Sequence, residues 1–172
     1  GTKLYFGPIW DFDLALGNAN EGEELYTDIF VGNGRGSGGS MGTWFAVAMM
    51  QEWFRQLVQN RWNEIYSSIS EMPKYILDEG ELGLRSYERN FEKWKIFGTV
   101  QNRETEYITR LSTYTEHYEY LAEWLTNRLE WLNGAFNDEG FVSEGKGTLL
   151  EMMRAWNGEG DENRRNNYGN KD

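Results

Sequence analysis

Two aspartates separated by one residue, Asp11 and Asp13, are the side chains of this sequence best suited to chemistry. Residues two apart in an extended segment point to opposite faces, so the carboxylates converge only if the backbone turns at Phe12. Carboxylates in a chain without cysteine favour a hard cation such as Mg²⁺, Mn²⁺ or Ca²⁺ over zinc. A structural alternative stands beside this one, in which each carboxylate accepts backbone N–H groups and caps a turn.

The composition narrows the classes of function. The chain has 172 residues, with 28 acidic and 17 basic side chains and a net charge of −11, so we expect no nucleic-acid partner. The absence of cysteine excludes thiol catalysis and thiolate metal sites. No apolar run reaches the roughly 20 residues of a membrane span. Aromatic residues make up 16% of the chain and need a core or a ligand to cover them.

The aspartates follow a short aromatic segment that predicts a strand at residues 4–6, broken by Gly7-Pro8. Downstream lies a glycine-rich stretch at residues 32–42, in which Gly34, Gly36 and Gly39 match the pattern GxGxxG. Any tract this rich in glycine produces such a match, so we expect a flexible loop there rather than a phosphate cradle.

Residues from 43 onward predict helices. One apolar face runs from Phe54 to Ile69, and a second pattern at 75–97 is expected to break early at Gly80 and Gly83. The strongest periodicity, with apolar residues alternately 3 and 4 apart, predicts one long helix over about 102–133 with Gly134 as its C-cap. The expected fold is therefore mainly α, a bundle of helices with a short N-terminal β segment.

The remaining candidates have simpler interpretations. His117 lies on a flank of the long stripe, where we expect a solvated or edge-packed side chain rather than a base. Arg61 beside Trp62 and Arg128 near Trp131 indicate cation–π contacts or buried ion pairs within the helical lobe. Residues 136–156 are expected to form a docking segment, and residues 157–172 a disordered tail or linker.

The run KLYFGPIWDFDLALGN at residues 3–18 resembles the signature of the spore coat protein CotH kinase family. The downstream order is similar as well, with Trp53-Phe54, then Arg61-Trp62, then Arg89-Asn90-Phe91. The resemblance covers roughly residues 3–135. It implies a protein-kinase-like α+β fold whose helical lobe is the part seen here, and transfer of the ATP γ-phosphoryl group to Ser or Thr of a protein substrate. It also implies a bacterial protein that is extracellular or in the spore coat.

By this resemblance Asp11-Phe12-Asp13 stands where ordinary kinases have Asp-Phe-Gly. Asp11 would then bind the Mg²⁺ (or Mn²⁺) that bridges the ATP phosphates. Asp13 would be a second ligand or a structural carboxylate. Asn18 would cap the turn or hold the following loop at the nucleotide site.

The family's nucleotide-gripping lysine and its catalytic aspartate and asparagine lie upstream of this motif. Residues 1–135 are therefore expected to be the C-terminal part of the domain, formed by a metal-binding turn at 8–18, the glycine-rich loop at 32–42 and a helical lobe at 43–135. The partner implied is the N-terminal lobe of the same domain. No catalytic residue is assigned, and the chain alone is expected to be inactive. The alternative is a non-catalytic helical assembly or binding module of a spore coat or extracellular complex.

Overall fold

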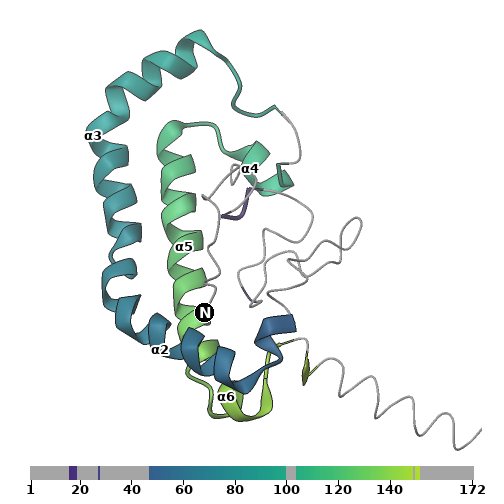
Figure 1. Ribbon diagram of the computed structural model, residues 1–172. Helices are drawn as coiled ribbons and strands as arrows, with labels where there is room; N and C mark the ends of the chain where they lie inside the picture. Colours follow the sequence, from purple (N-terminus) through teal and green to yellow (C-terminus); the bar gives the residue numbers. More distant parts are fainter. Residues whose placement is uncertain (1–15, 19–26, 28–46, 100–103, 149, 152–172) are drawn as a thin grey trace, which may run out of the picture.

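The computed structural model describes residues 16–18, 27, 47–99, 104–148 and 150–151. Within these ranges the chain is helical and contains no strand, which confirms the mainly-α prediction (Figure 1). The strand expected at residues 4–6 and the glycine-rich loop lie outside the described residues. The helices are α2 (Glu52–Ile69), α3 (Met72–Lys93), α4 (Glu106–Arg110), α5 (Tyr114–Phe136) and α6 (Glu139–Glu144).

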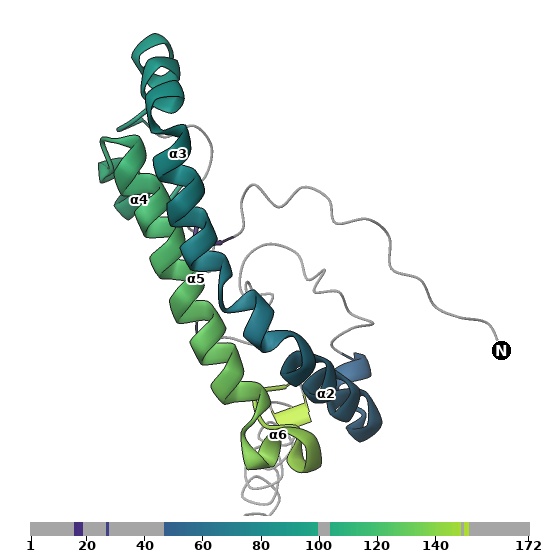
Figure 2. The same cartoon turned by 90° about the vertical axis from the view of Figure 1, so that its left-hand side faces the viewer.

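The two longest helices, α3 and α5, lie side by side and antiparallel along most of their length (Figures 1 and 2). Pro73 stands in the first turn of α3, where its missing N–H leaves no helical hydrogen bond unmade. The expectation that Gly80 and Gly83 break this helix is wrong. Gly80 is buried, and a Cβ there would lie 2.6 Å from Cγ of Tyr118, so the missing side chain lets α5 approach closely.

The hydrophobic core lies around the C-terminal half of α5, where α2 packs against both α5 and α6 (Figure 1). Trp62 is the buried residue of the apolar face of α2 predicted from the sequence, and its ring packs edge-on against Phe136 at 5.1 Å. The Trp62 indole N–H donates to Oδ1 of Asn133, 3.0 Å away. The buried apolar residues of this core are Met49, Trp62, Trp124, Leu125, Leu129, Phe136 and Phe141.

One arginine is buried in this core with 2% of its surface exposed. The Arg55 guanidinium donates to the carbonyl of Val142 through Nε and Nη2, at 2.8 and 2.6 Å, and to that of Met49 through Nη1, at 2.9 Å. A buried guanidinium is tolerated only when its N–H groups find acceptors, and these backbone carbonyls supply them. Arg55 therefore ties α2 to the segment that contains α6.

The long helix predicted over 102–133 is wrong in one respect, because the stripe is divided between α4 and α5. Thr113 caps α5: its hydroxyl accepts from the Glu116 N–H at 3.2 Å, and the Glu116 carboxylate accepts from the Thr113 N–H at 2.9 Å. These reciprocal bonds form a capping box, which starts a new helix at Tyr114. The Ser112 and Thr113 N–H groups hold the pKa of Glu116 below its usual value.

Gly134 is not the C-cap of this helix. The helix continues to Phe136, with Asn137 as its cap, and Gly134 lies within the last turn. A Cβ at Gly134 would meet no atom within 4 Å, so no packing contact requires glycine there.

Charged side chains lie mostly on the outer faces of the helices. Arg61 pairs with Glu64 at 2.7 Å one turn along α2, and Lys74 pairs with Asp78 on α3, all four side chains being exposed. Arg128 is instead buried and lies over the ring of Trp131 at 5.6 Å, the cation–π contact that the sequence indicated. Within the described residues no helix is both long and apolar enough to cross a membrane.

Candidate functional site

The last residues of the aspartate-containing motif are described, and they rest on α5. Leu16 and Gly17 both have left-handed backbone, with φ of 58° and 83°, which makes a tight turn before Asn18. The Tyr120 hydroxyl donates to the Gly17 carbonyl at 2.9 Å. This hydrogen bond joins residues 103 apart in sequence and fixes the C-terminal end of the motif on the middle of α5.

Gly17 is buried in close contact with two aromatic rings. A Cβ at this position would lie 2.5 Å from Cδ1 of Trp124 and 2.6 Å from the hydroxyl oxygen of Tyr120. Both the positive φ and the close approach require glycine here. We call the contact of Gly17 with Tyr120 and Trp124 the motif anchor.

Of the three predicted site residues, only Asn18 lies within the described part of the chain. Asp11 and Asp13, the predicted metal ligands, lie outside it, as do Gly34, Gly36 and Gly39 of the glycine-rich loop. Asn18 is half-buried directly after the motif anchor and lines a pocket. The role expected for Asn18, to cap the turn or to hold the following loop at the nucleotide site, stays a prediction.

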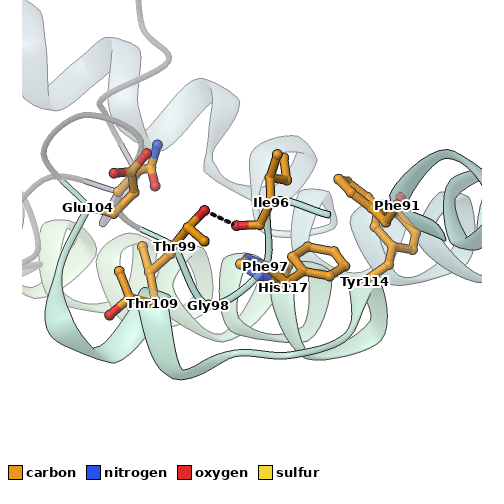
Figure 3. Close-up of a pocket in the computed structure, with 11 residues that line it drawn as sticks. Phe91, Ile96, Phe97, Gly98, Thr99, Glu104, Thr109, Tyr114 and His117 are labelled. Carbon is orange, nitrogen blue, oxygen red and sulfur yellow. Dashed lines mark hydrogen bonds between the residues drawn. The ribbon is translucent and has the colours of Figure 1, made fainter. Parts of the chain in front are cut away.

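The pocket beside Asn18 has a volume of about 250 Å³ (Figure 3). It lies between the C-terminal end of α3, the turn that follows it, α4 and the first turn of α5. Gly98, with φ of 74°, allows this turn, and Thr99 closes it with an N–H bond to the Ile96 carbonyl at 3.2 Å. The other lining side chains are Phe91, Phe97, Glu104, Ile108, Thr109, Tyr114 and His117.

The imidazole of His117 is part of the pocket wall and stacks on Phe97, with ring centroids 4.7 Å apart and planes 18° apart (Figure 3). Burial lowers the pKa of His117 below 6.5, against smaller opposing effects of a hydrogen bond to the Leu111 backbone and of the Glu116 charge. Nε2 is buried and has no hydrogen-bond partner in the described part of the chain. The sequence expectation of an edge-packed side chain agrees with the stacking on Phe97.

Comparison with protein-family models gives a match to the family described as CotH kinase protein, over residues 1–132. The matched range takes in Asp11, Asp13, Asn18, the motif anchor and most of α5. The chain belongs to the CotH kinase family. Comparisons with curated proteins and with solved structures give no match.

Family membership confirms the resemblance first seen in the run at residues 3–18. In this CotH-family chain the C-terminal end of the motif packs on α5, because Tyr120 and Trp124 both contact Gly17. The sequence analysis assigned no role to Tyr120 or Trp124 and so missed the motif anchor. The one available signal was the glycine that ends the motif, but its partner lies too far along the chain for local patterns to identify.

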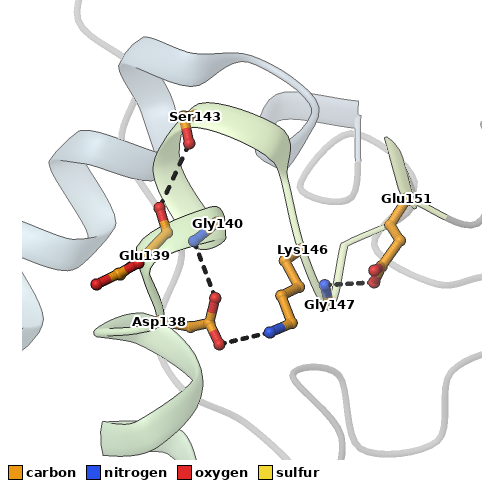
Figure 4. A network of polar contacts seen from close by, with 7 residues as sticks. All are labelled: Asp138, Glu139, Gly140, Ser143, Lys146, Gly147 and Glu151. Carbon is orange, nitrogen blue, oxygen red and sulfur yellow. Dashed lines mark hydrogen bonds and ion pairs between the residues drawn. The ribbon is translucent and has the colours of Figure 1, made fainter.

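A cluster of polar contacts surrounds the N-terminus of α6 (Figure 4). The Asp138 carboxylate accepts from Lys146 Nζ at 2.6 Å and from the Gly140 N–H at 2.9 Å, and these bonds lower its pKa. The Glu151 carboxylate accepts from the Gly147 N–H at 2.7 Å. These bonds cap a short helix and close a loop, which accounts for the acidic side chains without a ligand.

The acidic and histidine side chains of the described residues form no cluster of three or more that could hold a metal ion. Asp11 and Asp13 lie outside the ranges searched, so they remain the candidate metal ligands of this chain.

Proposed function

We propose that this chain supplies the metal-binding motif and the helical lobe of a CotH-like protein kinase that transfers the γ-phosphoryl group of Mg²⁺–ATP to Ser or Thr of a protein. The observation that carries the proposal is the family match over residues 1–132, which includes the Asp11-Phe12-Asp13 motif. In phosphoryl transfer a carboxylate-bound Mg²⁺ neutralises the charge that develops on the phosphates, and most of catalysis is positioning.

The roles follow from the chemistry of each side chain. Asp11 is proposed as the ligand of Mg²⁺ or Mn²⁺, and Asp13 as a second ligand or a support for the turn. Asn18 would hold the chain at the exit of the motif. The motif anchor supports this arrangement because it holds the residue next to Asn18 on a packed helix, and catalytic groups need rigid support.

Residues 1–172 contain no side chain that we assign as the catalytic base, so we propose that this chain by itself does not complete the transfer. The expected activity is that of a bacterial protein acting in the spore coat or outside the cell, with a protein as substrate. Binding of metal and nucleotide is the part of the function that this chain can be asked to show.

The test is calorimetric titration of Mn²⁺ with ATP into the protein and into three aspartate variants. Asp11→Asn is expected to abolish metal-dependent binding, and Asp13→Asn to weaken it less. Asp78→Asn, an exposed residue paired with Lys74 on α3, is the matched control and should bind as the parent does. Unchanged binding in both motif variants, with unchanged helicity, contradicts the assignment.

The second candidate is a non-catalytic helical assembly module. It is favoured by large apolar side chains that α2 and α3 leave uncovered, including Trp53, 67% exposed, and Leu82, 80% exposed. One measurement distinguishes the two candidates, namely metal and nucleotide binding by a protein that contains this chain together with its N-terminal lobe. Absence of both metal and nucleotide binding there favours assembly over phosphoryl transfer.

A further inference from the structure

We propose that the groove between α3 and α5 binds an extended peptide segment that places an arginine side chain on Tyr75 and Glu79 and an apolar ring on Tyr87. The proposal does not rest on the kinase function, because its steps use only residues of α3 and α5. Four features carry it: the exposed apolar side chains that line the groove, its length, the free faces of its tyrosine rings and its charge.

The groove leaves large apolar side chains in contact with solvent. It has a volume of about 470 Å³ and lies between two helices that run side by side (Figure 2). Tyr75, Leu82 and Tyr87 line it and are 63%, 80% and 46% exposed. Single apolar residues scattered over a surface are ordinary, but several that gather along one groove are typical of a surface that binds another molecule.

The length of the groove fits a peptide better than a single ring. Tyr75 and Tyr87 are the first and last residues of α3 that line it. They lie twelve residues apart, which is about 18 Å along the helix at 1.5 Å per residue. Five or six residues of extended chain, each about 3.3 Å long, span that distance.

The tyrosines at the two ends offer free ring faces. The ring of Tyr75 stacks on no other aromatic ring in the described part of the chain. One face of Tyr87 stacks on Tyr114, with centroids 4.3 Å apart. A Cβ at Gly83 would lie 2.6 and 2.9 Å from Cε2 and Cδ2 of Tyr87 but 4.0 Å from Cζ, so Gly83 meets an edge of that ring. The outer face of Tyr87 is therefore open to solvent, and a proline or aromatic ring can stack on it.

The charge of the groove favours a cation. Glu79 lines it one turn after Tyr75, a spacing that puts the two side chains next to each other on the helix. Glu79 makes no ion pair in the described part of the chain, and no described lysine or arginine lines the groove. An arginine side chain can stack its planar guanidinium on the Tyr75 ring and donate to the Glu79 carboxylate at the same time.

A second copy of this chain matches the groove less well than a basic peptide does. Each copy has a net charge of −11, so two copies repel each other before they meet. The charged side chain that lines the groove is itself acidic, that of Glu79. A peptide with arginine has the complementary charge and is attracted by the whole chain as well as by the groove.

The test compares two peptides that differ in one charge. The first is acetyl-Arg-Ala-Ser-Ala-Phe-amide, and the second has citrulline, a neutral isostere, in place of arginine. Each is titrated into the full chain labelled with ¹⁵N, and amide shifts are followed by NMR. We expect shifts at Glu79, Gly80 and Gly83, and an affinity about three- to ten-fold higher for the arginine peptide, the effect of one cation–π contact and one exposed ion pair. Added salt should lower this ratio of affinities by screening the ion pair.

Variants of exposed residues separate the two ends of the groove. Glu79→Gln and Tyr75→Leu should each lower the ratio of the two affinities, and their combination should bring it close to one. Tyr87→Leu should weaken both peptides alike and leave the ratio unchanged, because this ring lies about 12 Å along the helix from Glu79. Glu81→Gln changes an exposed carboxylate on the other side of α3 and is the matched control, with the ratio of the parent.

Three results would overturn the proposal. The first is equal affinity of the parent for the two peptides, or amide shifts that avoid the groove. The second is a ratio that persists in the double variant of Tyr75 and Glu79. The third comes from sedimentation of the protein without peptide, in which a dimer that Leu82→Arg dissociates would assign the groove to a second copy of this chain.

Discussion

The two ends of α5 are built from similar residues and have opposite packing. Towards its C-terminus, Trp124, Leu125 and Phe136 are each at most 8% exposed in a closed core. At its N-terminus, Tyr114 and His117 are only half-buried and line a pocket. Aromatic side chains at helical spacing therefore do not by themselves determine whether a region becomes core or binding surface.

The difference lies in what covers each end. At the C-terminal end α2 packs against both α5 and α6, and Phe141 of α6 contacts Phe136 of α5. Arg55 ties α2 to α6 through the Val142 carbonyl. At the N-terminal end the cover consists of the end of α3, the turn at 94–99 and the five-residue helix α4. Short elements bury less apolar surface, so the rings stack on one another and leave space between them.

Truncation of one ring at each end gives the largest expected effect. Trp62→Ala should lower the free energy of unfolding by about 3–5 kcal/mol, because it leaves a cavity in a closed core and removes the bond to Asn133. Phe97→Ala should cost less than about 2 kcal/mol, since that ring already faces open space. Chemical denaturation of both variants checks this. Equal losses would mean that the two ends are packed alike.

Two glycine-to-alanine substitutions, one in contact with α5 and one within it, are expected to change the free energy of unfolding by intermediate amounts and in opposite directions. Gly17→Ala should destabilise by roughly 1–3 kcal/mol, because the new methyl group collides with Trp124 and Tyr120 and the backbone has φ of 83°. Gly134→Ala should stabilise by about 0.5–1 kcal/mol, since its Cβ meets no atom and the position is helical. Thermal melts of the two variants compare them. Similar melting temperatures would argue against the motif anchor.

The smallest expected effect is a pH dependence of the free energy of unfolding that comes from His117, at the N-terminal end of α5. The folded-state pKa of His117 lies below its usual value of 6.5, so the unfolded chain takes up the proton first as pH falls. The free energy of unfolding should therefore decline as pH falls below 6.5 and level off below the folded pKa. His117→Phe should lack this step, and His117 is the one histidine of the chain. A step of the same size in that variant would assign the titration elsewhere.

Local patterns in the sequence predicted the helices well where apolar spacing is regular. The face from Phe54 to Ile69 corresponds to α2, and most of the pattern at 75–97 falls in α3. Gly80 misled the prediction because its low helix propensity is outweighed by close packing against Tyr118. The division at 111–113 was missed because the apolar stripe continues across it, while the stop comes from the polar cap formed by Thr113 and Glu116.

For the candidate site, the sequence predicted the family and the motif, and the family match confirms the first. The assignments of Asp11 and Asp13 to metal, and of Asn18 to the nucleotide site, stay predictions. The motif anchor and the pocket could not be predicted, because each joins segments about 20 to 100 residues apart. Contacts of that kind depend on how helices pack, which no local pattern records.

The buried guanidinium of Arg55 also limits where a recombinant fragment of this protein can end. The family match ends at residue 132, but the acceptor for Nε and Nη2 of Arg55 is the carbonyl of Val142, and Phe141 beside it is fully buried. A recombinant fragment ending at 132 would strand a positive charge in an apolar interior and remove part of the wall around it. We therefore expect a fragment to need residues up to at least Thr148, which is 1% exposed and lies sixteen residues beyond the end of the family match, in order to fold as the full chain does.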